Sequence, residues 1–322
     1  MTKELDAYDY KILYELDGNS RESASNIAKK VRLSKVSVNQ RIKRLFERGV
    51  VKNFTTQVNY RLLGYNTSRI YYKLQNIPAN KEEEFFNFLC SLKSVGYVAR
   101  IDGAWDVFSV ILYKSNEEFD LILNKINKKY GHFIKERNIL TVLNIIYFGR
   151  RYLSKIKEEE VTTPIIRKKP ENPIEIDKID HRILQNLSLN SRIQVTELME
   201  KLNLSKDILH YRLKKLIKEN AIQGFTINLN HEKFGNSFFK LLIKFNYNFD
   251  EKLFISKISS SNNLFRIIRL LGNWDLELDF EVKDNREMRQ IIKKIKEEVG
   301  PYIQNEDLLF VYQIDKLNFY PF

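Results

Sequence analysis

The sequence contains few of the residues that build disulfides, metal sites or membrane spans. Cys90 is the single cysteine, so no disulfide can form within the chain. The four histidines, at positions 132, 181, 210 and 231, lack the spacing of metal ligands. No apolar run approaches the roughly 20 residues of a membrane span, and the first residues lack the apolar core of a signal peptide. We therefore expect a cytoplasmic protein with no membrane partner, no structural metal and no cofactor.

Acidic residues are also fewer than basic ones. The chain has 41 Asp and Glu against 54 Lys and Arg, which gives a formal net charge of +13 and a pI near 9.4. Such an excess favours a polyanionic partner, either nucleic acid or an anionic membrane face. The Lys-, Ile- and Asn-rich usage is also typical of an AT-rich genome, which alone would produce some basic bias. The position of the charge along the chain must therefore decide between these interpretations.

What the sequence does contain is an internal repeat. Seven positions return 171 residues later: Asp9, Ile12, Leu13, Leu16, Asn19, Ser20 and Arg21 become Asp180, Ile183, Leu184, Leu187, Asn190, Ser191 and Arg192. Further on, Gly103-Ala104-Trp105-Asp106 returns as Gly272-Asn273-Trp274-Asp275 with an offset of 169. Residues 154–176, between the copies, hold charge runs and three prolines with few large apolar residues, which predicts a linker.

The first 65 residues of each copy have the pattern of a winged helix-turn-helix. In the first copy Asp6 caps a helix with an apolar face, a second helix spans Ser23 to Val31, and Ser34 caps a third helix that ends at Gly49. The third helix places Val38, Ile42 and Leu45 inward. Val50-Val51 and the stretch from Phe54 to Tyr60 then predict two short strands that form a wing.

Charge near the third helix indicates a DNA-binding surface. From Ser23 to Arg61 there are ten basic residues and one acidic residue, Glu47. Since a solvated helix normally mixes charges of both signs, this one-sign stretch favours double-stranded DNA as the partner. The predicted DNA-binding residues are Lys35, Ser37, Asn39, Gln40, Arg41, Lys43 and Arg44, with Lys206, His210, Tyr211, Arg212, Lys214 and Lys215 in the second copy.

The second copy differs, because residues 194–232 hold six basic and five acidic residues, with Asp207 in the first turn of the third helix. We therefore expect the first helix-turn-helix to supply most of the DNA affinity.

The remainder of each copy predicts the strand and helix order βαββαβ. That order folds as a ferredoxin-like, α+β domain, a four-stranded antiparallel sheet with two helices on one face. The other face of this sheet would expose apolar residues, so we expect a second such domain to pack against it, either the other copy in the same chain or a copy in a homodimer. The predicted domains are 1–65 and 177–236 for the winged helix-turn-helices, 66–153 and 237–322 for the βαββαβ domains, and 154–176 for the linker.

The repeated Gly-x-Trp-Asp stretch lies between the two central strands of each such domain. One interpretation is a tight turn in which Gly takes an unusual backbone angle, Asp accepts hydrogen bonds and Trp fills an interface. The other is that these turns line a small-molecule site. The residues concerned are Gly103, Trp105, Asp106, Gly272, Trp274 and Asp275.

These residues together resemble the Lrp/AsnC family of feast-famine regulators, here as a tandem duplication. The resemblance rests on Leu5-Asp6, Asp9, Ile12-Leu13, Asn19-Ser20-Arg21, Leu33-Ser34, Arg41, Leu45, Gly49-Val50-Val51, Gly64-Tyr65, Gly103 and Asp106. It implies a sequence-specific, nucleoid-associated regulator that binds DNA through the third helix, pairs through its βαββαβ domains and holds an amino-acid-like effector near the Gly-x-Trp-Asp turns. Asn220-Ala221 departs from the usual Gly-Val, and two copies in one chain favour an asymmetric operator.

Two other functions stay open at this point. The architecture also resembles that of sirohaem decarboxylases, which act on tetrapyrroles, but the expected His-Asn-Tyr-x-Arg-like stretch is replaced by Gly96-Tyr97-Val98-Ala99-Arg100 and Phe265-Arg266-Ile267-Ile268-Arg269. No other catalytic motif is found, so we expect no enzyme. A chromatin-architectural protein that binds DNA without sequence preference would show the same basic charge. The amide and guanidinium groups of Asn39, Gln40 and Arg41 match base edges and favour specific recognition.

Overall fold

The computed structural model describes residues 5–154, 165–168, 173–246, 251–318 and 320–322. These residues divide into two compact units, and each unit contains parts of both copies. Unit 1 takes the chain up to Asn59, the segment that begins at Phe148, and Glu175–Asn236. Unit 2 takes Tyr60–Tyr147, Ile165–Ile174 and Ser237–Phe322. The helix-turn-helices thus form one unit and the βαββαβ domains the other, and unit 1 ends six residues before the boundary predicted at residue 65.

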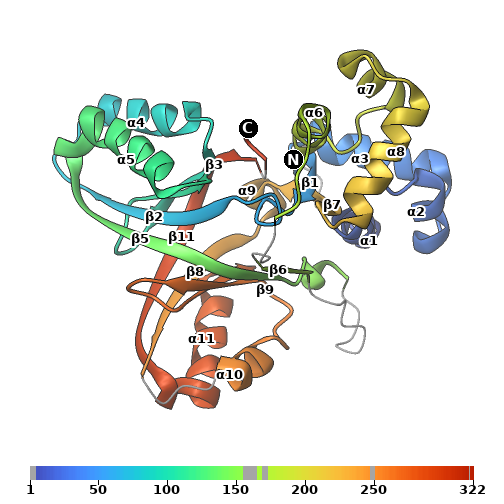
Figure 1. The fold of residues 1–322 in the computed structure, drawn as a ribbon. Helices are drawn as coiled ribbons and strands as arrows, with labels where there is room; N and C mark the ends of the chain where they lie inside the picture. Colours follow the sequence, from blue (N-terminus) through green and yellow to red (C-terminus); the bar gives the residue numbers. More distant parts are fainter. Residues whose placement is uncertain (1–4, 155–164, 169–172, 247–250, 319) are drawn as a thin grey trace. The chain divides into compact units, whose positions relative to one another are not determined.

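Unit 1 contains the six predicted helices (Figure 1). The first copy has α1 (Ala7–Gly18), α2 (Ala24–Val31) and α3 (Lys35–Glu47), and the second copy has α6 (Lys178–Leu189), α7 (Val195–Leu202) and α8 (Lys206–Lys218). The predicted caps Asp6 and Ser34 are present, because the side chain of each accepts a hydrogen bond from a backbone N–H of the helix that follows. Ser23, which was expected to be the first residue of the second helix, caps α2 in the same way. Asn220 adopts a left-handed φ of 59°, like Gly49 at 69°, so the departure from Gly preserves the turn.

The prediction of two short strands in the wing is wrong. A single strand, β1 (Val51–Val58), stands where two short strands were expected, and it pairs antiparallel with β7 (Ile222–Leu229) of the other copy. No glycine or proline interrupts residues 51–58, so nothing reverses the chain there to make a hairpin. The hydrogen bonds of this strand are satisfied between the copies, and a short helix, α9 (His231–Phe234), follows β7. Ile227, Leu229 and Phe234 accordingly complete the core of the first helix-turn-helix.

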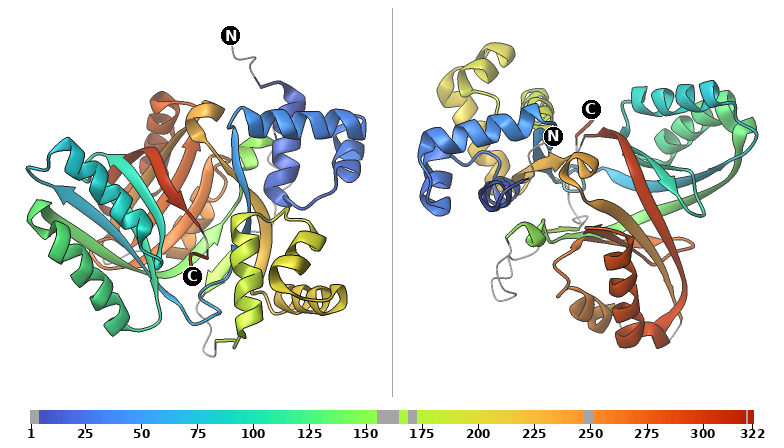
Figure 2. Two further views of the ribbon diagram at one scale, coloured as in Figure 1. Left: turned by 90° about the horizontal axis from the view of Figure 1, so that it is seen from above. Right: turned by 180° about the vertical axis from the view of Figure 1, so that it is seen from behind.

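Unit 2 contains the two βαββαβ motifs. The first runs β2 (Asn66–Leu74), α4 (Ala79–Ser91), β3 (Val95–Asp102), β4 (Val107–Tyr113), α5 (Asn116–Tyr130) and β5 (Ile134–Tyr147). The second runs β8 (Ser237–Phe245), α10 (Glu251–Ile258), β9 (Leu264–Leu271), β10 (Leu276–Val282), α11 (Asn285–Val299) and β11 (Ile303–Leu317). The helices of each motif cover the outer face of its strands (Figure 2). The 3-10 turns η1 (Gly131–Phe133) and η3 (Gly300–Tyr302) precede the last strands, and η2 (Arg151–Leu153) follows β5.

The strands of unit 2 close into a ring of eight. The order is β2, β4, β3, β11, β8, β10, β9, β5 and back to β2, with all neighbours antiparallel. The ring closes because β5 and β11 are long: each pairs with its own sheet through its first half and with the other copy through its second half. The two copies therefore pair within one chain, and the face that each sheet leaves bare is buried inside the ring.

The linker prediction is wrong in part. Residues 155–164 and 169–172 lie outside the described residues. Between them, β6 (Ile165–Lys168) pairs antiparallel with the second half of β5. Its Ile-Ile pair and the free edge of β5 explain why this segment joins the sheet. No helix of the described chain is long and apolar enough to cross a membrane.

Candidate nucleic-acid interface

The third helix of each helix-turn-helix presents a defined outward face. On α3, Lys35, Val36, Asn39, Gln40 and Lys43 are exposed, whereas Val38 and Leu45 are buried in the core. On α8 the exposed residues are Lys206, Asp207, Ile208, His210, Tyr211 and Lys214, and in the last turn Ile217 and Lys218. Ser37, Arg41, Arg44, Arg212 and Lys215 are half-buried. The exposed polar side chains are thus mainly basic and amide groups on α3, where the one carboxylate, Glu47, is the last residue of the helix and pairs with Lys43 at 3.6 Å. On α8 they are a mixed set, and Asp207 lies in the first turn.

Arg41 points back into the protein. Its guanidinium donates to the carboxylates of Asp6 at 2.8 Å and Asp9 at 2.7 Å, and Asp9 is buried. Burial lowers the pKa of Arg41, but these two carboxylates outweigh it and raise the pKa. Arg41 therefore fastens the recognition helix to α1, a role that the sequence analysis missed. The sequence does carry a signal for this contact, because the acidic residues Asp6 and Asp9 recur as Asp177 and Asp180 in the second copy.

The second copy repeats the contact between the recognition helix and the preceding acidic residues, but with one basic residue fewer. Arg212 donates to Asp177 at 2.7 Å and to Asp180 at 2.9 Å. In the first copy Arg44 adds a third ion pair, with Asp9 at 2.8 Å, and Lys215 replaces it in the second. Within the described residues, Arg212 is the only ion-pair partner of Asp180. The first recognition helix is consequently held more firmly than the second.

The helix-turn-helices are joined through a nearly two-fold interface inside unit 1. The hydroxyls of Ser20 and Ser191 lie 2.6 Å apart in a buried hydrogen bond. Arg21 donates to the carbonyl of Ser191, and Arg192 donates to the carbonyl of Glu22 at 3.0 Å. The repeated Asn-Ser-Arg stretch is thus the joint between the copies. It fixes α3 and α8 in one body, as a reader of two DNA half-sites requires.

One buried ion pair breaks this symmetry. Arg150, which follows β5, donates to Asp17 at 2.6 Å, and Thr226 of the other copy donates to the same carboxylate at 2.9 Å. Asp17 is replaced by Ser188 in the second copy. The two helix-turn-helices are therefore not interchangeable, which is consistent with their different charge.

The Gly-x-Trp-Asp turns support the structural interpretation. Gly103 and Gly272 adopt φ values of 132° and 143°, and a Cβ on either would lie 2.8 Å from a leucine side chain of the opposite copy, Leu309 or Leu140. Asp106 accepts hydrogen bonds from Leu74 N–H and Lys73 Nζ, both at 2.7 Å.

Asp275 repeats these contacts with Phe245 and Lys244. Trp105 is buried, and Trp274 is half-buried. These residues close the ends of the strands against the other copy.

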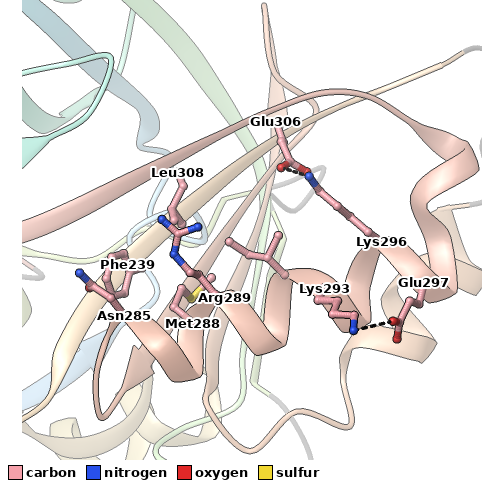
Figure 3. Close-up of a pocket in the computed structure, with 10 residues that line it drawn as sticks. Phe239, Asn285, Met288, Arg289, Lys293, Lys296, Glu297, Glu306 and Leu308 are labelled. Carbon is pink, nitrogen blue, oxygen red and sulfur yellow. Dashed lines mark ion pairs between the residues drawn. The ribbon is translucent and has the colours of Figure 1, made fainter.

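A groove in the second copy marks a further difference between the halves. It measures about 710 Å³ and lies between α11 and the outer face of β8 and β11, with Phe239, Met288 and Leu308 among its lining (Figure 3). In the first copy, Tyr113 and Phe119 stack at 4.5 Å at the equivalent positions. In the second copy Val282 and Met288 replace them, and Phe239 replaces Ser68, so the two copies differ in the side chains that face the second helix of the motif.

Comparison with known proteins matches both copies of the repeat to one family model and parts of the chain to known regulators. The family model for winged helix-turn-helix DNA-binding domains matches residues 5–52 and 176–223. An uncharacterised HTH-type transcriptional regulator of Pyrococcus abyssi is 30% identical over 127 residues, which are 38% of this chain and 84% of that protein. The regulator Ptr1 of Methanocaldococcus jannaschii is 31% identical over 119 residues, 37% of this chain and 79% of that protein.

The chain belongs to the Lrp/AsnC-type transcriptional regulators. It is a duplicated, DNA-binding member, as the resemblance implied. Among solved structures, the sirohaem decarboxylase NirDL aligns over 97% of this chain and 93% of its own, with a TM-score of 0.62 at 15% identity. That likeness is one of fold, and it includes the duplicated architecture.

Proposed function

We propose that this Lrp/AsnC-type regulator recognises a specific, asymmetric DNA element and that α3 supplies most of the affinity. The exposed face of α3 is the observation that carries the proposal: Lys35 and Lys43 can neutralise phosphates, while Asn39 and Gln40 can pair with base edges. The matching face of α8 carries Asp207, which repels phosphate, beside His210 and Tyr211. Two different recognition helices on one unit favour two different half-sites. The place of action would be the nucleoid.

The decisive experiment is selection of bound DNA from a random library, repeated with Gln40→Ala and with Tyr211→Ala. Gln40 and Tyr211 occupy equivalent exposed positions, so each variant is the matched control for the other. Gln40→Ala removes an amide that can pair with a base edge, which should cost about 1–3 kcal/mol at defined positions of one half-site. Tyr211→Ala should change affinity less. Equal effects would show that both helices read DNA with equal weight.

Salt dependence separates specific recognition from architectural binding. Lys43→Ala should weaken binding to all sequences and reduce the salt slope by about one, because it removes one phosphate contact. Lys214→Ala is the equivalent change on α8. A ratio of specific to nonspecific affinity above about 10³ supports the regulator, and a ratio below about 10 with the same steep salt slope indicates architectural binding.

An amino-acid-like effector near the Gly-x-Trp-Asp turns is a separate proposal. It would have to act beside Asp106 and Asp275, whose carboxylates already accept hydrogen bonds from strand ends. Calorimetric titration with the common amino acids tests this effector proposal. Whether two or more chains assemble into an oligomer is a separate question, which size-exclusion chromatography with light scattering tests. No heat with any amino acid would leave these turns a purely structural role.

We propose that the chain is not an enzyme. The region that replaces the decarboxylase-like stretch places Tyr97 on β3 and Arg266 on β9, and neither strand carries a histidine. The cavity beside these residues measures about 50 Å³, whereas sites for drug-sized ligands measure roughly 300–1,000 Å³ and a tetrapyrrole is no smaller. Addition of an iron tetrapyrrole should leave its absorbance spectrum unchanged. A saturable spectral shift would reopen the enzymatic interpretation.

A further inference from the structure

Five charged side chains form a buried network inside the strand ring of unit 2. They are Arg69, Lys240, Arg266, Glu277 and Asp279. Arg69 donates through Nε to Glu277 at 2.6 Å, Lys240 bridges Glu277 at 2.8 Å and Asp279 at 2.9 Å, and Arg266 donates through Nε to Asp279 at 2.7 Å. The hydrogen-bonded network thus holds three cations and two carboxylates. Glu281, two residues further along the same face of β10, is a third buried carboxylate. Because every buried charge and donor needs a partner, donors that these carboxylates leave unused favour a further acceptor.

Glu277, the central carboxylate of this network, is ionised. Burial raises the pKa of Glu277, but Arg69 and Lys240 outweigh that effect, and the pKa lies well below the ordinary value. Tyr71 donates its hydroxyl to Glu277 at 2.6 Å. Glu277 is therefore saturated with donors and cannot serve the remaining ones.

Three donors are left over at one end of the network, around a cavity of about 50 Å³. Arg69 and Arg266 each use Nε and Nη2 for their carboxylates, and within the described residues Nη1 of neither makes a hydrogen bond. Tyr97 is 6% exposed, and its hydroxyl has no hydrogen-bond partner among the described residues. All three residues line the same cavity. A buried donor without an acceptor, as the Tyr97 hydroxyl is, is rare in folded proteins and calls for a ligand or water.

We propose that this cavity binds a short-chain monocarboxylate, such as acetate, held by Arg69, Tyr97 and Arg266. The arginine Nη1 groups and the tyrosine hydroxyl would donate to the carboxylate. Val110, Leu112 and Ile145 also line the cavity and would contact the alkyl end. Arg69 and Tyr97 belong to the first copy and Arg266 to the second, so the ligand bridges the copies.

Size and charge select this ligand class. One water needs roughly 10–15 Å³ of such space, so 50 Å³ accommodates about four small heavy atoms. A carboxylate offers two oxygens in a geometry that matches guanidinium donors, whereas sulfate or phosphate would bring more charge and four oxygens to a partly apolar wall. The proposal does not depend on DNA binding, so its failure leaves the proposed function intact.

The test is titration of the full-length protein with ¹³C-labelled acetate, followed by saturation-transfer NMR at constant ionic strength. For a ligand of four heavy atoms a dissociation constant of about 1 mM is expected. Acetamide has the same shape and no charge, and it should bind at least tenfold more weakly. Tyr97→Phe removes one hydrogen bond and should weaken acetate about tenfold.

Tyr130→Phe is the matched control. Tyr130 is also buried with an unpartnered hydroxyl, but it packs under the helices of the first copy and does not line the cavity. It should leave acetate affinity unchanged. The proposal is overturned if acetate and acetamide bind alike, if Tyr97→Phe and Tyr130→Phe behave alike, or if acetate shows no saturable binding up to about 50 mM, in which case water fills the cavity.

Discussion

Replacing Arg212 or Arg41 with methionine should destabilise unit 1 by different amounts. Methionine keeps an unbranched side chain but removes the charge. Removing one partner of a buried ion pair costs about 3–5 kcal/mol. The Arg212 side chain is 21% exposed, so we reduce the cost of Arg212→Met to about 2–3 kcal/mol. Asp180 would be left buried with no ion-pair partner among the described residues.

Arg41→Met should cost less, about 1 kcal/mol, because Asp9 keeps two donors. Arg44 lies 2.8 Å from Asp9, and the backbone N–H of Asp6 donates to it at 3.2 Å. At about 3 °C per kcal/mol for a unit of this size, Arg212→Met should lower the melting temperature by roughly 6–9 °C and Arg41→Met by about 3 °C.

Calorimetry or thermal circular dichroism of both variants measures this difference. Lys214→Met, at an exposed position on the same helix, should shift the melting temperature by less than 2 °C. Equal destabilisation by Arg41→Met and Arg212→Met would refute the argument from partner number. Shifts no larger than that of Lys214→Met would show that the arginines serve DNA alone.

Three further predictions follow from unit 2. The folded pKa of Glu277 lies below its ordinary 4.5, so the ionised side chain stabilises the fold fully above about pH 4.5, and this contribution is lost as the pH falls further. The melting temperature of the wild type should therefore fall more steeply below pH 5 than that of Glu277→Gln. Parallel curves for the two proteins would disprove this. Gly103→Ala and Gly272→Ala should each cost about 2 kcal/mol or more in urea unfolding, since both combine a left-handed φ with a 2.8 Å clash, and Gly131→Ala, whose Cβ has room, is the control. Met288→Phe should add apolar volume to the lining of the groove and raise stability by about 1 kcal/mol, whereas a lower melting temperature would mean that Met288 is already well packed.

Helices and strands of each copy were predictable because each has a local cause. Asp6, Ser23 and Ser34 have side chains that cap helices, and alternating apolar residues mark the strands. The strands of the wing were mispredicted because the partner of β1 lies about 170 residues away in the sequence, and no local pattern reveals which strand will accept its hydrogen bonds. The strand at Ile165–Lys168 was missed for the same reason.

The DNA-binding site could be predicted from the sequence only as one exposed face of α3. Charge and spacing placed Lys35, Asn39, Gln40 and Lys43 outward, and the structure exposes all four. Arg41 was assigned to DNA because a basic residue on a recognition helix usually contacts DNA. Its acidic partners lie about 32–35 residues earlier on another helix, so only the packing of α1 against α3 shows the contact.

The buried network explains why two copies in one chain can differ as they do. Arg69 corresponds to Lys240, but Glu277 and Asp279 correspond to Phe108 and Val110, so both carboxylates belong to the second copy alone. Two first copies paired with each other would bury Arg69 twice with no acidic partner from this network, a cost of several kcal/mol per charge. Pairing of a first copy with a second copy supplies Glu277 to Arg69. The interior therefore selects unlike copies over like ones, and it is this pairing that leaves the two recognition helices free to diverge.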